Sequence, residues 1–346
     1  MSLQAMLGVE LPIVQAPMAG SQGHALAAAV SNAGALGSLP CAMLGLPQMR
    51  DELTALSAAT ARPFNVNFFC HTPPTPDAQR EANWRGALAP YYREFGLDPL
   101  APVSAPSRAP FSLEAAQVLA QFRPAIVSFH FGLPAPELLA HVRSWGAKVL
   151  ASATTLDEAR WLEARGVDAI IAQGAEAGGH RGMFLSDDLT TQAGTFALLP
   201  QLVRAVNRPV IVAGGIACAA GVRAALALGA AGVQVGTAYL LCPEATTSAV
   251  HRAALQSGAV RRTALTNLFS GRPARGIVNR LMRELGPISS LAPAFPLASA
   301  GIAPLRAHAE RNGSGDFSPL WSGQNPSGCK AVPAAELTRD LALGLQ

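Results

Sequence analysis

Charged residues are scarce in this sequence. Only 14% of its 346 residues are Asp, Glu, Lys or Arg, whereas 50% are hydrophobic. This composition fits helices packed on both faces of a buried sheet, whose strands carry few charges. The net charge of +4 is too small to indicate a nucleic-acid or membrane partner, and no acidic run is long enough to form a tail.

Paired cysteines and long hydrophobic runs are also missing. The five cysteines lie far apart and never form C-x-x-C, which argues against a disulfide framework or a metal site and favours a reducing compartment. No hydrophobic run approaches the ~20 residues of a membrane-spanning helix. The N-terminal MSLQAMLGVE lacks the basic and apolar segments of a signal peptide. We therefore expect a cytoplasmic protein.

Short apolar runs alternate with alanine- and leucine-rich stretches of helical spacing, which predicts parallel strands joined by helices. The expected strands are Pro12–Met18, Ala35–Pro40, Phe64–Phe69, Ala125–Phe131, Lys148–Thr154, Ala169–Gln173, Val210–Ala213 and Gly232–Leu240. Eight such units predict an α/β fold of the closed (β/α)8, or TIM, barrel type. An open doubly wound sheet is the alternative, which the absence of G-x-G-x-x-G after the first strand weakens.

Two stretches interrupt this alternation. An insert after the third strand has proline-rich ends, TPPTP at Thr72–Pro76 and PLAPVSAPSRAP at Pro99–Pro110, which argue against a regular helix throughout. The chain after the eighth strand predicts a small, mostly helical cap, with a loop at Pro287–Pro304. The expected division is residues 1–244 for the barrel with its insert at about 71–110, 245–320 for the cap or substrate domain, and 321–346 for the return to the barrel.

The stretch Ala169–Gly182 predicts a strand that leads into a glycine-rich polar loop. Gly178 and Gly179 let backbone N–H groups approach a ligand, because no Cβ intervenes. His180 follows directly, and imidazole exchanges protons near neutral pH. Taken alone, this pattern is explained better by a structural loop histidine.

Polar residues and glycines recur where the other strands end. Met18 follows the first strand, Asn67 lies near the end of the third and His130 near the end of the fourth. Glycines follow the seventh and eighth strands, at Gly215 and Gly236, which is where such barrels bind phosphate through free N–H groups and a helix dipole. These residues predict a phosphate-bearing ligand in the barrel mouth.

Seven motifs in order resemble the class I nitronate monooxygenases, formerly called 2-nitropropane dioxygenases: PIVQAPMAG, NVNFFCH, VSFHFGLP, QGAEAGGHRG, PVIVAGGI, GVQVGTAYL and SGRPARGI. The resemblance implies FMN bound to a (β/α)8 barrel and the oxidation of alkyl nitronates by O2 to a carbonyl compound and nitrite, a detoxification. It implies that propionate 3-nitronate is a favoured substrate and that His180 is the catalytic base and anion-binding group. The implied FMN contacts are Met18, Asn67, Gln173, Gly178, Gly215, Gln234, Gly236 and Thr237.

The chain departs from the family in its tyrosines. Related bacterial enzymes line the substrate pocket with tyrosines and a lysine from the cap, but the three tyrosines here are Tyr91, Tyr92 and Tyr239, none of them in the expected cap. Phe295 stands where the family has tyrosine. We assign His130 and Phe295 to the substrate pocket, and expect Tyr91, Tyr92 or a cap arginine to bind a substrate carboxylate.

The expected partners are a small anionic substrate and O2, and the expected assembly is a monomer or homodimer. Two other functions stay open. An FMN-dependent NAD(P)H reductase of quinones or enoyl thioesters would keep the same phosphate turns. A flavin-free lyase or isomerase acting on a phosphorylated substrate would also use them.

Overall fold

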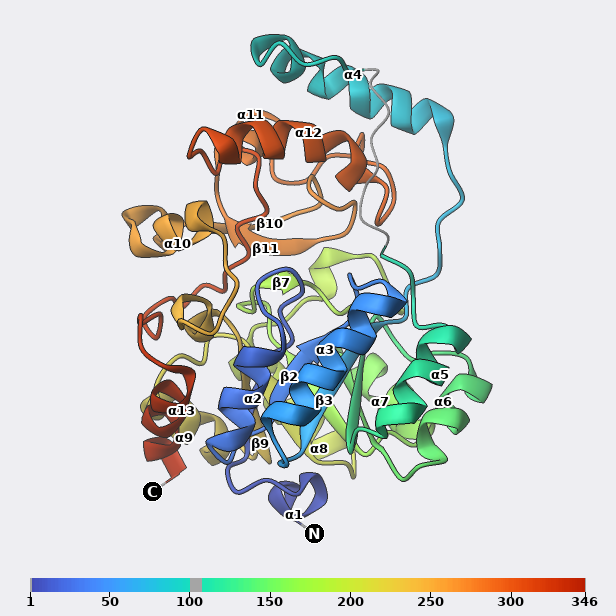
Figure 1. Cartoon of the computed structure of the whole chain (residues 1–346), viewed down its shortest axis with the longest axis vertical. Helices are drawn as coiled ribbons and strands as arrows, with labels where there is room; N and C mark the ends of the chain where they lie inside the picture. Colours follow the sequence, from blue (N-terminus) through green and yellow to red (C-terminus); the bar gives the residue numbers. More distant parts are fainter. Residues whose placement is uncertain (1, 100–107, 346) are drawn as a thin grey trace.

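A closed barrel of parallel strands forms the centre of the protein, whose computed structural model describes residues 2–99 and 108–345 (Figure 1). Its strands are β1 (Ile13–Gln15), β2 (Gly37–Pro40), β3 (Phe64–Phe69), β4 (Ile126–His130), β5 (Lys148–Ala153), β6 (Ala169–Gln173), β8 (Val210–Ala213) and β9 (Gly232–Val235). They pair in parallel in the order β1-β9-β8-β6-β5-β4-β3-β2. A parallel bridge between Val14 and Leu36 joins the two ends of this order. The predicted (β/α)8 barrel is therefore confirmed, and the open sheet is wrong.

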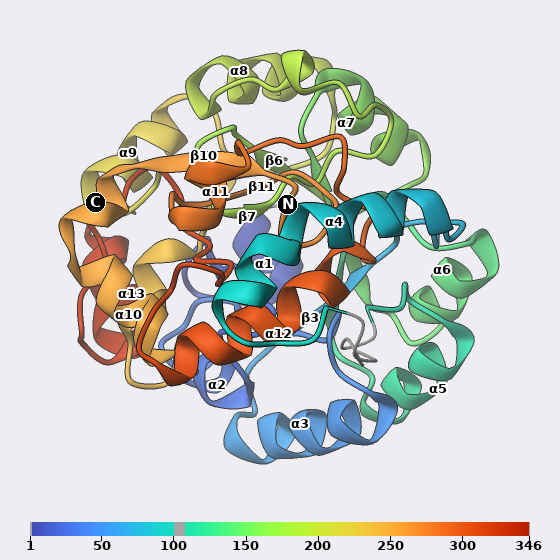
Figure 2. The same ribbon diagram turned by 90° about the horizontal axis from the view of Figure 1, so that it is seen from above.

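Helices surround the barrel as a ring (Figure 2). They are α2 (His24–Asn32), α3 (Leu46–Ala59), α5 (Leu113–Phe122), α6 (Pro136–Arg143), α7 (Leu156–Ala164), α8 (Thr195–Ala205), α9 (Ala219–Ala227) and α13 (Ala334–Ala342), with short 3-10 turns η1 (Leu189–Thr191) and η4 (Leu343–Leu345). Their apolar faces and the outward side chains of the strands, such as Phe129 and Val149, form one buried core. None of the helices in the described ranges is both long and apolar enough to cross a membrane.

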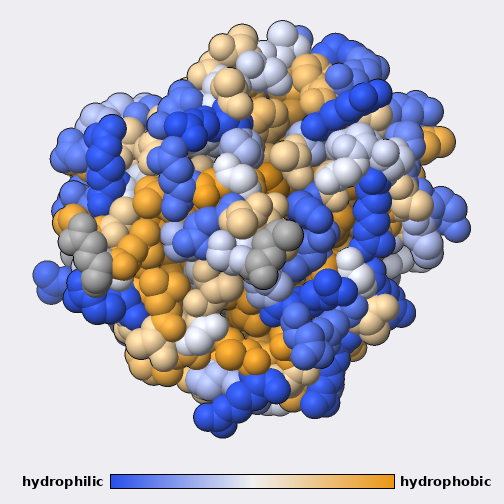
Figure 3. All heavy atoms as spheres, turned by 90° about the horizontal axis from the view of Figure 1, so that it is seen from below, coloured by the Kyte–Doolittle hydropathy of each residue, from blue (hydrophilic) through white to orange (hydrophobic). Residues whose placement is uncertain are grey.

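A short helix, α1 (Leu3–Leu7), closes the end of the barrel away from the cap. Its Leu3 and Leu7 are buried against the inward-facing Val14, Leu36 and Ile211. Figure 3 shows this face of the molecule, where hydrophobic residues lie in short stretches among hydrophilic ones. Side chains thus fill this end of the barrel among the described residues.

The eighth strand is shorter than expected. The sequence predicts a strand over Gly232–Leu240, but β9 ends at Val235 and a 3-10 helix, η2 (Thr237–Leu241), follows it. The backbone leaves the extended region at Gly236, with φ −117° and ψ −72°. The apolar run continues because η2 is buried too. Hydrophobicity alone therefore does not mark the turn that brings Thr237 to the barrel mouth.

The insert after β3 contains one long helix, which packs on the helices of the cap. Helix α4 (Ala78–Glu94) lies between the two proline-rich ends; residues 100–107 of the second are outside the described residues. Asp77 caps the start of the helix, because its side chain accepts from the N–H of Arg80. The helix packs on α12 (Ala298–Arg311), where Trp84 donates to the carbonyl of Ala298 at 3.2 Å.

The rest of the cap combines helices with a small sheet over the barrel mouth (Figure 2). Its elements are α10 (Ala249–Gln256), η3 (Gly258–Arg261), β10 (Thr263–Thr266), β11 (Ala274–Ile277), α11 (Arg280–Glu284) and α12. The predicted loop Pro287–Pro304 is wrong in its second half, because α12 begins at Ala298 and continues past Pro304. Burial of Ile302 and Leu305 in the cap core offsets the hydrogen bond that proline cannot make.

The cap sheet contains a strand that the sequence does not reveal. Strand β7 is only Gly179–His180, in the loop after β6, and it pairs antiparallel with β11 in the order β10-β11-β7. Residue Ala274 is the partner of His180 in this register. A barrel loop and the cap are thus joined through one sheet.

We expect Gly37→Ala to destabilise the barrel strongly. A Cβ on Gly37 in β2 would lie 1.9 Å from the carbonyl oxygen of Ala27 in α2, so the helix or the strand would have to move. Overpacking of this kind lowers the free energy of unfolding by about 3 kcal/mol. Urea unfolding followed by circular dichroism measures the change.

Gly86 provides the matched control, because a Cβ there would meet no heavy atom within 4 Å in α4. Alanine is more favourable than glycine inside a helix by about 1 kcal/mol, so Gly86→Ala should keep or raise stability. Equal stability of the two variants would contradict the steric explanation for Gly37.

Candidate active site

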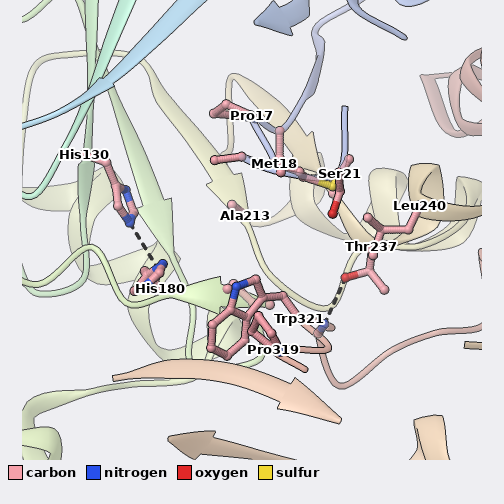
Figure 4. Close-up of a pocket in the computed structure, with 18 of the residues that line it drawn as sticks. Pro17, Met18, Ser21, His130, His180, Ala213, Thr237, Leu240, Pro319 and Trp321 are labelled. Carbon is pink, nitrogen blue, oxygen red and sulfur yellow. Dashed lines mark hydrogen bonds between the residues drawn. The ribbon is translucent and has the colours of Figure 1, made fainter. Parts of the chain in front are cut away.

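A cavity of about 360 Å³ lies at the carboxyl end of the barrel, beneath the cap (Figure 4). The residues expected to contact a flavin all line it: Met18, Asn67, Gln173, Gly178, Gly215, Gln234, Gly236 and Thr237. His130 and His180 line it as well, whereas Phe295 is not among its lining residues. The structure brings these strand ends together, and their individual ligand contacts stay predictions.

The glycine turns after β8 and β9 fit a phosphate group. Gly215 has φ +74°, and its carbonyl accepts from the side-chain amide of Asn325 at 2.8 Å. Within the described part of the chain, the backbone N–H groups of Gly215 and Gly236 have no hydrogen-bond acceptor. A Cβ on Gly236 would lie 3.3 Å from Cβ of Ala16. An anionic group binds to N–H donors that have no other acceptor, on a backbone that it can approach closely. The two glycine turns provide both.

The side-chain amides around the cavity differ in which of their hydrogen-bonding atoms are already paired. Gln173 donates to the carbonyl of His180 at 2.9 Å and accepts from the N–H of Gly182 at 2.7 Å, so it holds the loop after β6. Asn67 donates to Oγ of Ser128 at 2.9 Å. Oε1 of Gln234 is buried and has no partner among the described residues. This acceptor fits the N–H edge of a flavin ring, so the residues present suit the cofactor.

The segment after the cap seals one side of the cavity. The N–H of Gly323 donates to Oγ1 of Thr237 at 2.9 Å (Figure 4), and the N–H of Gln324 donates to the carbonyl of Glu176 at 2.9 Å. Gly178 packs so closely here that a Cβ would lie 2.5 Å from the nitrogen of Gly323. The return segment therefore connects the loops after β6 and β9.

His180 lies on the cavity wall, half-buried, with Nε2 2.8 Å from Oγ of Ser270 in the cap. Burial lowers the pKa of His180 well below its usual range, and the positive charge of Arg108 acts in the same direction, as do His130 and Arg272. Its imidazole is therefore neutral at pH 7. A neutral imidazole has one nitrogen lone pair that can accept a proton.

His130 supports the backbone of His180 (Figure 4). Its Nε2 lies 3.2 Å from the carbonyl oxygen of His180, and its Nδ1 lies 3.0 Å from Oγ of Ser152. A carbonyl only accepts, so Nε2 of His130 carries the proton and Nδ1 accepts from the serine. Burial lowers the pKa of His130 to about 4, which keeps it neutral.

This lowered pKa predicts acid sensitivity. The unfolded state takes up a proton on His130 near pH 6.5, and the folded state does so only near pH 4. Neutral His130 therefore makes its full contribution to the free energy of unfolding above pH 6.5. This contribution, about 3 kcal/mol, is lost as the pH falls from 6.5 to 4. Urea unfolding at pH 7 and pH 4.5 should show a smaller pH dependence in His130→Gln than in the original protein. An unchanged difference would contradict the prediction.

An aromatic wall with two arginines stands beside His180. The ring of Phe295 lies 5.3 Å from that of His180, and Phe131 lies under the guanidinium of Arg272 at 4.2 Å from its centroid. Phe295 thus contacts the catalytic candidate without lining the cavity. Arg108 lines the cavity, and its Nη1 is buried without a hydrogen-bond partner in the described ranges. The arrangement favours a bound anion.

Tyr91 and Tyr92, which we expected beside the substrate, lie in the cap core away from the cavity. Tyr92 donates to the carbonyl of Gly301 at 2.8 Å, and Tyr91 packs edge-on against Phe317 at 5.2 Å. Both lie on α4 in the cap core and neither lines the cavity. They sit in the cap because α4 packs there, which the sequence position of the insert does not indicate.

Two residues that hold the loop of His180 are not evident from the sequence. Arg181 is fully buried and donates to the carbonyls of Gln173 and Gly174 at 2.7 and 2.6 Å. Ser270 contacts His180 from the cap. An arginine directly after His180 in this glycine-rich motif was the available signal for the first. No cluster of His, Cys, Asp and Glu in the described ranges suits a metal ion.

Comparison with known proteins gives similarity along the whole chain. A family model described as nitronate monooxygenase matches residues 1–344. A nitronate monooxygenase from Paraburkholderia phytofirmans is 43% identical over 98% of this chain and 93% of its own, and one from Pseudomonas aeruginosa is 42% identical over 97% and 96%. The crystal structure of a nitroalkane oxidase from Streptomyces ansochromogenes aligns with a TM-score of 0.90 at 38% identity, covering 100% of this chain and 98% of that one.

Proposed function

This chain belongs to the nitronate monooxygenase family and is a flavin-dependent oxidoreductase, and from that premise we propose that it binds FMN and oxidises alkyl nitronates of the propionate 3-nitronate type with O2, giving a carbonyl compound and nitrite. One observation carries the proposal: the glycine turns that suit a phosphate and the neutral His180 open on the same cavity. The residues that would hold FMN are Met18, Asn67, Gln173, Gly178, Gly215, Gln234, Gly236 and Thr237.

FMN, when bound, would accept electrons from the substrate and pass them to O2. The chain itself has the tasks of binding, orienting and moving a proton. Arg108 supplies positive potential to an anionic substrate, because its guanidinium lines the cavity with Nη1 unpaired in the described part of the chain. The aromatic wall that includes Phe69 and Phe295 excludes water near His180.

His180 has two tasks that depend on the substrate. With a neutral nitroalkane, its lone pair removes the α-proton and produces the nitronate. With a nitronate already formed, it binds the anion by a hydrogen bond. The low pKa of His180 supports the first task, because the imidazole is free of a proton at pH 7. His130 fixes the position of His180 through its carbonyl.

Oxygen consumption tests the proposal. The purified yellow protein receives propionate 3-nitronate as the sole reductant, without NAD(P)H, while an electrode records O2 and a colour reaction records nitrite. We expect rapid O2 uptake with nitrite release, and none with propionate as the matched control. Released flavin should have the mass of FMN.

Two other results would overturn the proposal. No O2 uptake with any nitronate, together with bleaching of the flavin by NADH under anaerobic conditions, would replace the proposal with a reductase. A colourless protein that takes up no flavin would replace it with a flavin-free barrel enzyme.

A further inference from the structure

Ser270 occupies the first position of the SGRPARGI motif, Ser270–Ile277, and belongs to no expected contact with cofactor or substrate. It lies in the cap between β10 and β11 and is 1% exposed. Its Oγ lies 2.8 Å from Nε2 of His180, which is on β7 in the barrel loop. A buried hydroxyl in contact with the proposed base affects which nitrogen of that base is available.

The hydroxyl of Ser270 has one hydrogen and two neighbours that can accept it. One is Nε2 of His180, and the other is the carbonyl oxygen of Arg272, 3.3 Å away. In the described part of the chain, this carbonyl has no other donor. If the hydrogen goes to the carbonyl, Nε2–H of His180 donates to Oγ and every group is paired. If it goes to Nε2, the carbonyl of Arg272 is left without a donor among the described residues, which is the less favourable arrangement.

We propose that Ser270 is a positioning residue that holds His180 in the tautomer with its proton on Nε2, so that Nδ1 is the atom that takes the α-proton of a neutral nitroalkane. This inference rests on the proposed function. No hydrogen bond of Nδ1 to another described residue competes with this role. In the step, the Cα–H bond of the substrate breaks and its proton forms an N–H bond at Nδ1. The electron pair forms the C=N bond of the nitronate.

The rest of the motif fixes the backbone beside His180. Arg275 pairs with Gly179 in the β11–β7 register and donates from Nε to the carbonyl of Ala175 at 2.8 Å. The N–H of Arg181 donates to the carbonyl of Pro273 at 2.8 Å. The backbone on both sides of His180 is therefore fixed to the same cap segment that carries Ser270.

Loss of the Ser270 hydroxyl should make His180 a weaker base. Oγ accepts from Nε2–H and therefore stabilises the imidazolium that forms when Nδ1 takes the proton. In Ser270→Ala this acceptor is gone, so the base is weaker and its tautomer is free. We expect kcat/KM for a neutral nitroalkane to fall about 10- to 100-fold, as for other lost hydrogen bonds to charged groups. The acid limb of its pH profile should move to lower pH.

The test compares the original protein with Ser270→Ala and Ser270→Thr, each loaded with flavin. Rates are measured with nitroethane and with preformed ethyl nitronate over a range of pH. We expect Ser270→Ala to lose activity toward nitroethane far more than toward the nitronate, and Ser270→Thr, which keeps a hydroxyl, to recover most of it. An unchanged ratio of the two rates and an unchanged acid limb would overturn the inference.

A second measurement does not depend on turnover. Imidazole 15N NMR of the flavin-loaded protein, with His180 identified by its absence in His180→Gln, reports which nitrogen carries the proton. We expect the proton on Nε2 in the original protein, and a proton on Nδ1 would overturn the inference. If the protein oxidises no nitronate at all, the proposed function fails, whereas the NMR result still tests the role of Ser270 in fixing the tautomer.

Discussion

We expect His180→Gln to lower kcat/KM for a neutral nitroalkane by about 10³-fold, the middle of the range for loss of a general base. Glutamine has no side-chain nitrogen that takes up a proton near neutral pH, so the α-proton must leave to water. The loss toward a preformed nitronate should be much smaller, because that substrate has already given up its proton. Steady-state O2 uptake with the two forms of one substrate measures the difference.

The pH dependence gives an independent check on the same residue. The pKa of His180 is well below its usual range, because the residue is buried and Arg108 is near. Activity toward the neutral nitroalkane should therefore persist below pH 6.5 and decline only as the pH falls through that lowered value. In His180→Gln this acid limb should disappear.

His308 is the matched control for this substitution. It lies in α12 of the cap, stacks on Phe95 with centroids 4.4 Å apart and does not line the cavity. His308→Gln should leave both rates unchanged. Equal losses toward nitroalkane and nitronate in His180→Gln would show that His180 binds the anion and does not act as a base.

We expect Gly178→Ala to weaken flavin binding, with a rise in the flavin Kd of about 100-fold or more. A Cβ at this position would lie 2.5 Å from the nitrogen of Gly323 and 2.6 Å from the carbonyl carbon of Ser322. Both neighbours are backbone atoms, so no side chain can rotate to relieve the contact. The return segment must move away, and with it the N–H that Thr237 accepts.

Flavin content after gel filtration, read from visible absorbance per protein, measures this loss. Circular dichroism should show that the barrel remains folded, since Gly178 lies outside the barrel core. Gly258→Ala is the control, because a Cβ there meets nothing within 4 Å in η3. Full flavin retention in Gly178→Ala would contradict the role given to the return segment.

The barrel was predictable because its strands are buried on both faces and appear in the sequence as uninterrupted apolar runs. β3 and β6 have the bounds that the sequence predicts. The candidate site followed from the barrel, because polar residues and glycines at the carboxyl ends of parallel strands must meet at one end. That reasoning placed Asn67, His180 and Gly215 on one cavity without any knowledge of the cap.

The cap was less predictable because tertiary contacts decide its structure. Strand β7 is two residues long and has no periodicity; it exists because β11, whose sequence position is far away, pairs with it. Prolines in these segments hid the helical pattern of α4 and α12 in the sequence. Both helices form because they pack on each other, with Trp84 and Ile302 buried in the cap core that they share. Ser270 was overlooked for the same reason, since nothing near it in the sequence points to His180.

The sheet shared by barrel and cap also constrains how this protein can be recombined. A chimera that joins the barrel of one relative to the cap of another, cut in the connection after β9, would take β7 from one parent and β11 from the other. His180 would then be aligned by a strand that did not evolve with it. New substrate ranges obtained by exchanging caps therefore require the segment Gly178–Gly182 and helix α4 to be transferred together with residues 245–320.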